Sequence, residues 1–171
     1  ASDRIIADLM EMARGRPPER RTVRVGDLVR DAVARVPDAP MGSIEASFDP
    51  GEHALLNVDA GQFMQVLLNL IGNGFQACER AGRPPRVHVA VVVTDAGAEV
   101  RVSDAGDGVE PEHRVRIFEP MFSTRSKGTG LGLAICRQIV ERHGGELTLD
   151  HGPSRLGGSC FTVRLPPPDA S

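Results

Sequence analysis

The chain has 171 residues, and its 40% hydrophobic and 25% charged content is ordinary for a soluble globular protein with one core. Its net charge of −3 and its lack of Trp and Tyr argue against a nucleic-acid-binding surface, and no apolar run is long enough to span a membrane. Three cysteines lie scattered in apolar surroundings without CxxC spacing, which predicts buried free thiols in a reducing, cytoplasmic compartment: Cys78, Cys136 and Cys160.

The first residues are expected to be the end of a longer helix, followed by a linker. Apolar residues with helical spacing run through residues 1–15: Ile5, Ile6, Leu9, Met12 and Ala13. The basic, proline-containing stretch at 16–21 would end that helix. We therefore expect a piece of a longer protein, in which one domain covers 22–166 and a disordered tail covers 167–171.

The expected elements of this domain are paired strands and three main helices. Alternating apolar residues predict strands at 21–25, 44–48, 53–58, 86–94, 98–104, 146–150 and 159–165. Helical spacing predicts helices at 26–36, from an N-cap at Asp59 through 77, and at 131–143, where Gly144 and Gly145 follow. Strands that come in pairs favour an α+β fold, with the helices on one face of a largely antiparallel sheet.

The helix that contains residues 65–77 carries an uncharged polar stripe. Asn69 and Asn73 are four residues apart and fall on one face, with Gly72 between them. One interpretation is an ordinary amphipathic helix with a narrow solvated face. The other is a wall that faces a ligand, because a solvated face usually carries Lys and Glu. Gly72 also costs the helix about 1 kcal/mol relative to Ala, and it leaves room for a ligand near the backbone.

Two glycine-rich segments could hold a nucleotide. The segment Gly-Thr-Gly-Leu-Gly at 128–132 lacks the Lys and Ser/Thr of a P-loop, but it opens onto a helix whose bare N–H groups favour an anion such as a phosphate chain. Lys127 and Arg125 precede it and could reach the same charge. Asp104 leaves a strand into a glycine turn, so it is either an Asx-turn residue or a buried carboxylate that accepts a hydrogen bond from the amino group of adenine.

These motifs occur in one order, and over residues 21–166 the sequence resembles the catalytic, ATP-binding domain of sensor histidine kinases of two-component systems. The motifs are the asparagine helix, Asp-x-Gly-x-Gly at 104–108, a Phe-containing segment at 117–124, Gly-x-Gly-x-Gly at 128–132, and Gly-Gly at 157–158. The resemblance implies the Bergerat α/β sandwich of the GHKL superfamily, which has a mixed sheet of about five strands with three main helices on one face.

The resemblance also implies a site for ATP and Mg²⁺. Asn73 would bind the metal that bridges the phosphates, with Asn69 nearby on the phosphate side; an amide oxygen is a hard ligand that suits Mg²⁺. The glycine segment before the third helix would cradle the phosphates, through Lys127, Gly128, Thr129, Gly130, Leu131 and Gly132.

On the adenine side, the resemblance assigns Asp104 to the amine of the base. Gly106 and Gly108 would let the chain pass close to the base, and Thr162 would meet adenine through water. Two phenylalanines would anchor the base of a flexible lid that covers ATP: Phe118 and Phe122.

The implied activity is transfer of the γ-phosphate of Mg-ATP to a histidine on a separate helical hairpin, and from there to the receiver domain of a response regulator. Residues 1–15 resemble the end of the second helix of that hairpin, so the acceptor would lie upstream of Ala1. The full protein would be a homodimer and this fragment mainly monomeric. No catalytic residue is expected in the chain, because none of its histidines has the acidic neighbour of the acceptor: His53, His88, His113, His143 and His151.

Two departures from related families bear on the chemistry. Hydrolases of the superfamily place a glutamate, the general base for water, where this chain has Asn69, and an amide cannot take that proton. Many kinases carry a basic residue where this chain has Gln76, and the lid between Phe122 and Gly128 is short. The alternatives that remain are a degenerate ATP-binding scaffold domain and an ATPase or serine kinase of the GHKL type.

Overall fold

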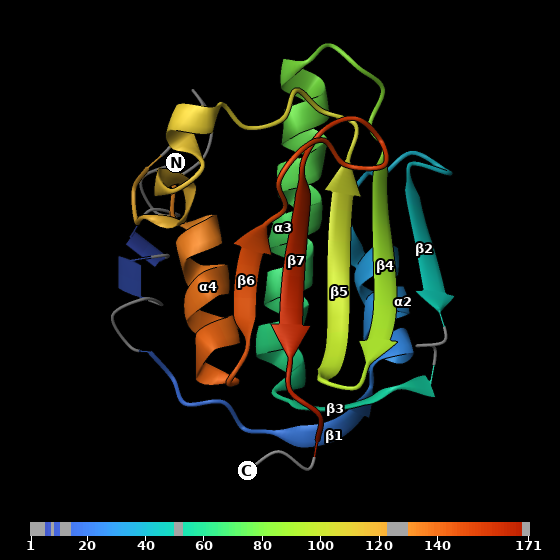
Figure 1. Ribbon diagram of the computed structural model, residues 1–171, viewed down its shortest axis with the longest axis vertical. Helices are drawn as coiled ribbons and strands as arrows, with labels where there is room; N and C mark the ends of the chain where they lie inside the picture. The colour runs from blue at the N-terminus through green and yellow to red at the C-terminus, as the bar shows by residue number, and fades with distance from the viewer. Residues whose placement is uncertain (1–5, 8, 11–14, 50–52, 123–129, 169–171) are drawn as a thin grey trace.

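The computed structural model describes residues 6–7, 9–10, 15–49, 53–122 and 130–168. Three α-helices cover one face of a five-stranded mixed sheet, and the opposite face carries no helix in the described part of the chain (Figure 1). This is the α+β architecture expected from the paired strands. The helices are α2 (Val25–Arg35), α3 (Ala60–Arg80) and α4 (Gly132–Arg142).

The sheet has the strand order β2-β4-β5-β7-β6. Strands β2 and β4 are parallel, and the other neighbours are antiparallel. A separate two-stranded sheet pairs β1 with β3, antiparallel. The strands are β1 (Arg21–Arg24), β2 (Ile44–Asp49), β3 (Leu55–Val58), β4 (Val87–Thr94), β5 (Gly97–Asp104), β6 (Glu146–Leu149) and β7 (Cys160–Leu165). All seven predicted strands are therefore present.

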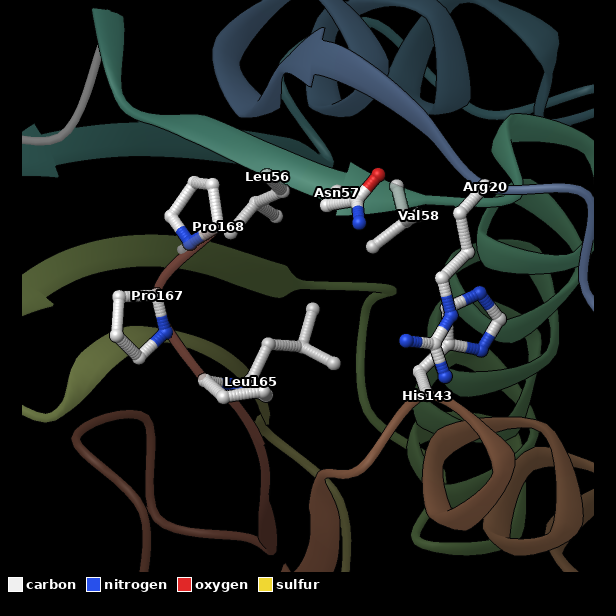
Figure 2. Close-up of a pocket in the computed structure, with 9 residues that line it drawn as sticks. Arg20, Leu56, Asn57, Val58, His143, Leu165, Pro167 and Pro168 are labelled. Atoms are coloured by element: carbon white, nitrogen blue, oxygen red, sulfur yellow. The ribbon is translucent and has the colours of Figure 1, made fainter. Parts of the chain in front are cut away.

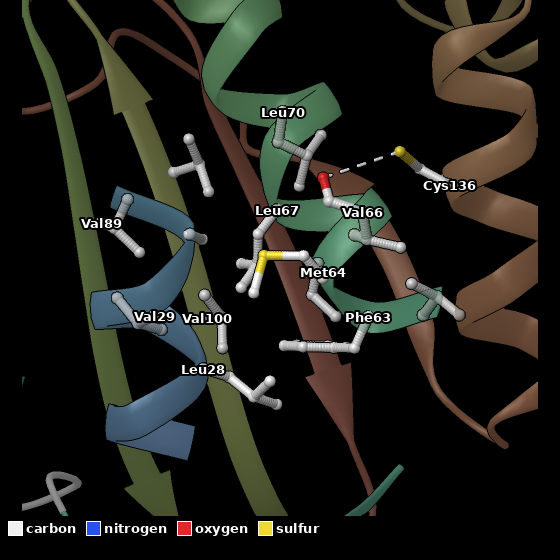
Figure 3. Close-up of a cluster of buried hydrophobic side chains, with 14 of the residues drawn as sticks. Leu28, Val29, Phe63, Met64, Val66, Leu67, Leu70, Val89, Val100 and Cys136 are labelled. Carbon is white, nitrogen blue, oxygen red and sulfur yellow. Dashed lines mark hydrogen bonds between the residues drawn. The ribbon is translucent and has the colours of Figure 1, made fainter. Parts of the chain in front are cut away.

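Helix α3 is the central helix, and its sequence accounts for its place. It begins after Asp59, whose Oδ1 accepts a hydrogen bond from the Gln62 N–H at 3.0 Å, as an N-cap does. Its apolar side chains, such as Leu67 and Leu70, are buried in the core cluster that also includes residues of α2 and the sheet. Val66 faces α4, where its carbonyl lies 3.9 Å from the Cys136 Sγ (Figure 3). Full burial of each such aliphatic side chain is worth roughly 1.5–3 kcal/mol.

Different residues lie at the two ends of the sheet. At one end, β5 stops at Asp104, which pairs in register with Val87 at the start of β4. At the other end, β7 stops at Leu165, beside β1 and β3. Figure 2 shows this second end, where Arg20 and His143 lie at one side of a cavity of about 20 Å³ and Pro167 and Pro168 lie at the other.

The segment before β1 is tied to the ends of two helices. Asp59 Oδ2 accepts the Glu19 N–H at 2.9 Å and pairs with the Arg16 guanidinium at 3.2 Å. The Asp59 N–H donates to His143 Nε2 at 3.0 Å, which joins the start of α3 to the end of α4. Residues 6, 7, 9 and 10 have helical backbone, but no helix of the described chain is both long and apolar enough to cross a bilayer.

Candidate functional site

A pocket of about 300 Å³ opens at the end of β5 where Asp104 lies. Helix α3 forms one wall, the turn after β5 a second, and the short helices before the segment 123–129 a third. The start of α4 and the start of β7 complete the lining. The lining residues are Asn73, Ala77, Arg80, Asp104, Asp107, Gly108, Val109, Glu110, His113, Ile117, Leu133, Ser159 and Phe161.

Asp104 is the buried acidic group of this pocket, with only 4% of its surface exposed. Its Oδ1 accepts N–H bonds from Gly106 at 2.9 Å and from Ser159 at 3.1 Å. Within the described chain no donor bonds to Oδ2. Burial raises the pKa of the carboxyl, while the two N–H bonds lower it and the nearby Asp107 raises it again. The net effect is a pKa above the usual value, with burial as the largest cause. Oδ2 is the Asp104 oxygen that is open to a ligand that donates.

Three glycines allow the chain to close tightly around Asp104. A Cβ at Gly158 would lie 2.2 Å from Asp104 Oδ1, and a Cβ at Gly106 would lie 2.5 Å from the Ala77 Cβ. A Cβ at Gly74 would lie 2.7 Å from Val87 Cγ2 and 3.2 Å from the Asp104 Cβ. Any side chain at these positions would push α3 or the turn away from the carboxylate.

The close approach of α3 to the sheet falls at Gly74, two residues after Gly72. A Cβ at Gly72 would meet no atom of the described residues within 4 Å. Gly72 therefore leaves space beside the α3 backbone, and the approach of a ligand there stays a prediction. The contact between helix and strand at Gly74 was not predicted. Gly108 is different again, because its φ of +77° favours glycine although a Cβ there would meet no described atom within 4 Å.

The two asparagines of α3 face different neighbours. Asn73 lines the pocket together with Ala77, one turn further along the helix. Asn69 lies one turn earlier, outside the lining, and its amide bonds to the buried Cys136 thiol of α4. Burial raises the pKa of that thiol to about 12, although the Asn69 bond lowers it. Of the two asparagines, Asn73 is the one that lines this pocket, and the place of Asn69 on the phosphate side stays a prediction.

The second glycine segment is described only in part. Gly130 has a φ of +73°, Leu131 is buried, and Gly132 begins α4, which no side chain of the described residues caps. A Cβ at Gly130 would lie 2.8 Å from the backbone of Met121, so the two flanks of segment 123–129 meet here. Three of the expected phosphate-side residues lie outside the described residues: Lys127, Gly128 and Thr129.

The phenylalanines expected at the base of the lid both have packing partners. Phe118 meets Phe161 of β7 edge to face, with ring centroids 6.1 Å apart. Phe122 lies 5.4 Å from the His113 ring, and the Arg116 guanidinium stacks 4.7 Å above it. The expected lid between Phe122 and Gly128 lies outside the described residues.

The structure does not bring Thr162 to the pocket. Side chains alternate along β7, so Phe161 and Val163 face the helices while Thr162 faces the other side of the sheet. Its Oγ1 donates to Asp150 Oδ1 at 2.7 Å. Ser159 lines the pocket instead, and its backbone N–H donates to Asp104 Oδ1. The position after Gly-Gly and before the strand was the available signal, but a residue that acts through its main chain leaves little trace in a sequence.

Comparison with known proteins identifies the family. Residues 58–169 match the model of the family described as histidine kinase-, DNA gyrase B-, and HSP90-like ATPase. The chain belongs to this ATPase family. It is 30% identical over 167 residues to sporulation kinase C of Bacillus subtilis, and 34% identical over 170 residues to the sensor histidine kinase ZraS of Klebsiella oxytoca. Each alignment covers 96% of this chain but only 38% and 35% of the relative, so the chain spans little more than a third of these proteins.

Solved structures show the same fold. The catalytic domain of histidine kinase ThkA superposes with a TM-score of 0.73 at 25% identity, covering 86% of this chain and 95% of that one. The ATP-binding domain of PrrB from Mycobacterium tuberculosis gives 0.68 at 28% identity, covering 88% and 99%. Full-length ShkA in complex with AMPPNP gives 0.75 at 28% identity, covering 98% and 36%. These likenesses confirm the Bergerat-type sandwich and the resemblance to sensor histidine kinases.

Proposed function

We propose that the chain is the ATP-binding catalytic domain of a sensor histidine kinase, which supplies the γ-phosphate of Mg-ATP to a histidine on a separate helical hairpin. The observation that carries this is Asp104, a buried carboxylate with one oxygen held by two N–H donors and the other open to a ligand at the end of a pocket. Family membership and the histidine kinase relatives support it.

The adenine base would lie between the apolar walls of the pocket, with its amino group on Asp104. Ile117, Leu133 and Phe161 supply the apolar surface. A hydrogen bond to an ionised carboxylate in a shielded site is worth roughly 1.5–3 kcal/mol. Guanine carries a carbonyl oxygen at the corresponding position and could not make it. Gly106 and Gly108 form the turn that would pass beside the base.

The triphosphate would extend from the base toward Asn73 and the start of α4. Of the described residues, no group of three His, Cys, Asp or Glu side chains could hold a metal ion by itself. A single amide ligand in a pocket fits Mg²⁺, which keeps several waters and takes its remaining ligands from phosphates. Mg²⁺ would neutralise phosphate charge, Asn73 would hold it, and Asn69 would support the phosphate side. The cradle would be the segment expected from the sequence, Lys127 to Gly132.

The residues of α3 favour transfer over hydrolysis. Hydrolysis needs a base for water, and the position one turn before Asn73 holds Asn69 rather than a carboxylate. Glu79 is the one acidic side chain of this helix, and it lies at the far end of it. ATP would then be held until a better-placed nucleophile attacks in line. That nucleophile would be the acceptor histidine upstream.

The proposed partners follow from the assignment of the chain to a sensor histidine kinase. The described residues of the first helix expose apolar side chains, Ile6 by 56%, Leu9 by 45% and Met10 by 47%. We assign residues 1–15 to the end of the hairpin, where a second helix would cover them, and 22–166 to the catalytic domain. The full protein would be a homodimer in the cytoplasm that passes its phosphate to a receiver domain.

Phosphotransfer in trans tests this function. The chain, mixed with γ-labelled ATP, Mg²⁺ and a protein that carries the upstream hairpin, should label a histidine of the hairpin and not itself. The product should be acid-labile and stable in alkali, as a phosphoramidate is. Asn73→Ala should abolish labelling and weaken Mg²⁺-dependent binding of AMPPNP, whereas Asn57→Ala on β3 should change neither. Binding without any transfer would instead indicate a scaffold domain, and label on the chain itself would contradict the proposed division of labour.

A further inference from the structure

The loop between β6 and β7 forms a tight turn on the backbone of Asp104. The Ser154 N–H donates to the Gly158 carbonyl at 2.7 Å, and the Gly157 N–H donates to the Ser154 carbonyl at 2.9 Å. The Gly158 N–H then donates to the Asp104 carbonyl at 3.0 Å. The turn therefore carries the chain directly past Asp104 before β7 begins.

The Ser154 hydroxyl group joins the turn to the backbone of Asp104. Ser154 Oγ donates to the Asp104 carbonyl at 2.7 Å, and it accepts the Leu156 N–H at 3.1 Å. The single oxygen of a hydroxyl can donate and accept at once. An alanine would leave the Leu156 N–H without this partner and would remove one of the hydrogen bonds that hold the turn on Asp104.

The turn places the Ser159 N–H at the pocket. This donor holds Asp104 Oδ1 at 3.1 Å and shares it with the Gly106 N–H. The Asp104 N–H in turn donates to the Ser159 carbonyl at 2.9 Å. Because Gly158 packs so closely on Asp104, a shift of the turn by a few tenths of an ångström would displace the donor from the carboxylate.

We propose that Ser154 is a positioning residue for nucleotide recognition, which fixes the 154–159 turn so that the Ser159 N–H orients the Asp104 carboxylate toward the adenine amine. This inference rests on the proposed function of the pocket. Ser154 does not line the pocket, so it acts through Asp104 and Ser159 rather than on the nucleotide. Loss of its hydroxyl should therefore affect ATP, which uses the Asp104 oxygen, more than GTP, which cannot.

The test compares affinities of the whole chain for the non-hydrolysable analogues of ATP and GTP, each with Mg²⁺, by calorimetry. Ser154→Ala should weaken the ATP analogue about tenfold, since a carboxylate that is no longer held in place makes a weaker hydrogen bond to the adenine amine. The GTP analogue should change by less than about twofold, so the preference for ATP should fall. Ser154→Thr, which keeps the hydroxyl, should restore both the affinity and the preference.

Ser43→Ala is the matched control for stability. Ser43 Oγ also donates to a loop carbonyl, that of Pro40 at 2.6 Å, but it lies before β2 at the edge of the sheet and outside the pocket. It should lower the melting temperature as Ser154→Ala does and leave both affinities unchanged. Equal loss for the two analogues in Ser154→Ala, an unchanged ATP affinity, or failure of Ser154→Thr to rescue would each overturn the inference. Failure of the wild-type chain to bind the ATP analogue would instead refute the proposed function.

Discussion

Two glycines on one helix give a paired test of how α3 meets the sheet. Gly72→Ala places a methyl group where no described atom lies within 4 Å, so it should stabilise the protein through helix propensity, by about 1 kcal/mol. Gly74→Ala gains the same propensity, but its Cβ would lie 2.7 Å from Val87 Cγ2 and 3.2 Å from the Asp104 Cβ.

The expected magnitude follows from these distances. Val87 is fully buried and β-branched, so it cannot swing away, and forcing an extra methyl into such a contact costs about 1–3 kcal/mol. Because the gain in helix propensity offsets part of this cost, the free energy of unfolding of Gly74→Ala should lie between that of wild type and about 2 kcal/mol below it. The difference between the two variants isolates the steric cost, because both carry the same change in the same helix.

Urea unfolding measures this difference directly, provided that the m-values agree between the variants. Gly74→Ala should also bind the ATP analogue more weakly, because the methyl group pushes on Asp104. Equal stabilisation by both substitutions would refute the contact between α3 and β4 at Gly74, and with it the explanation of how the pocket closes.

Two further predictions concern buried titratable groups. Burial lowers the pKa of His143 below its usual 6.5, and its neutral Nε2 accepts the Asp59 N–H. As the pH falls through 6.5 toward the pKa of the folded state, the unfolded chain therefore binds a proton that the folded chain does not. Stability should therefore fall from pH 7.5 to 5, by at most about 1.4 kcal/mol per pH unit for this group. The free energy of unfolding of His143→Gln, measured with urea, should depend less steeply on pH than that of wild type. Some dependence should remain, because the pKa of His88 is also lowered. Equal slopes for the two proteins would contradict the role given to His143. Cys136, whose pKa is raised to about 12, should resist a maleimide at pH 8 until urea unfolds the chain, and rapid native labelling seen by mass spectrometry would show that it is not buried against α3.

The strands and the position of Asp104 could be predicted because local patterns determine them. Alternating apolar residues specify a strand wherever one face is buried, and an acidic residue that ends a strand before glycines is visible in the sequence. The amide stripe of α3 was predictable for the same reason, since helical periodicity places Asn69 and Asn73 on one side. The separate destinations of these two amides were not, because α4 comes from a part of the chain more than 50 residues away.

The details around Asp104 depend on tertiary contacts that no local pattern encodes. Glycine is required at position 74 because Val87 of β4 passes there. Thr162 was misplaced because one step along a strand reverses the face of the sheet. Ser159 and Ser154 were missed since one acts through its N–H and the other through the backbone of Asp104. In each case the decisive partner is distant in sequence.

The central claim is that ATP binds between α3 and the turn that follows Asp104, and a nuclear magnetic resonance titration tests it most directly. Adding Mg-AMPPNP to the ¹⁵N-labelled chain should shift the amides of Gly106, Ser159 and Ala77 first, and should leave the turn between β4 and β5 at the other end of the sheet unchanged. In Asp104→Asn the side-chain amide can turn a donor toward the adenine amine, so the same shifts should require at least about ten times more ligand. Unchanged pocket amides at saturating ligand, or shifts centred on the other end of the sheet, would contradict the account.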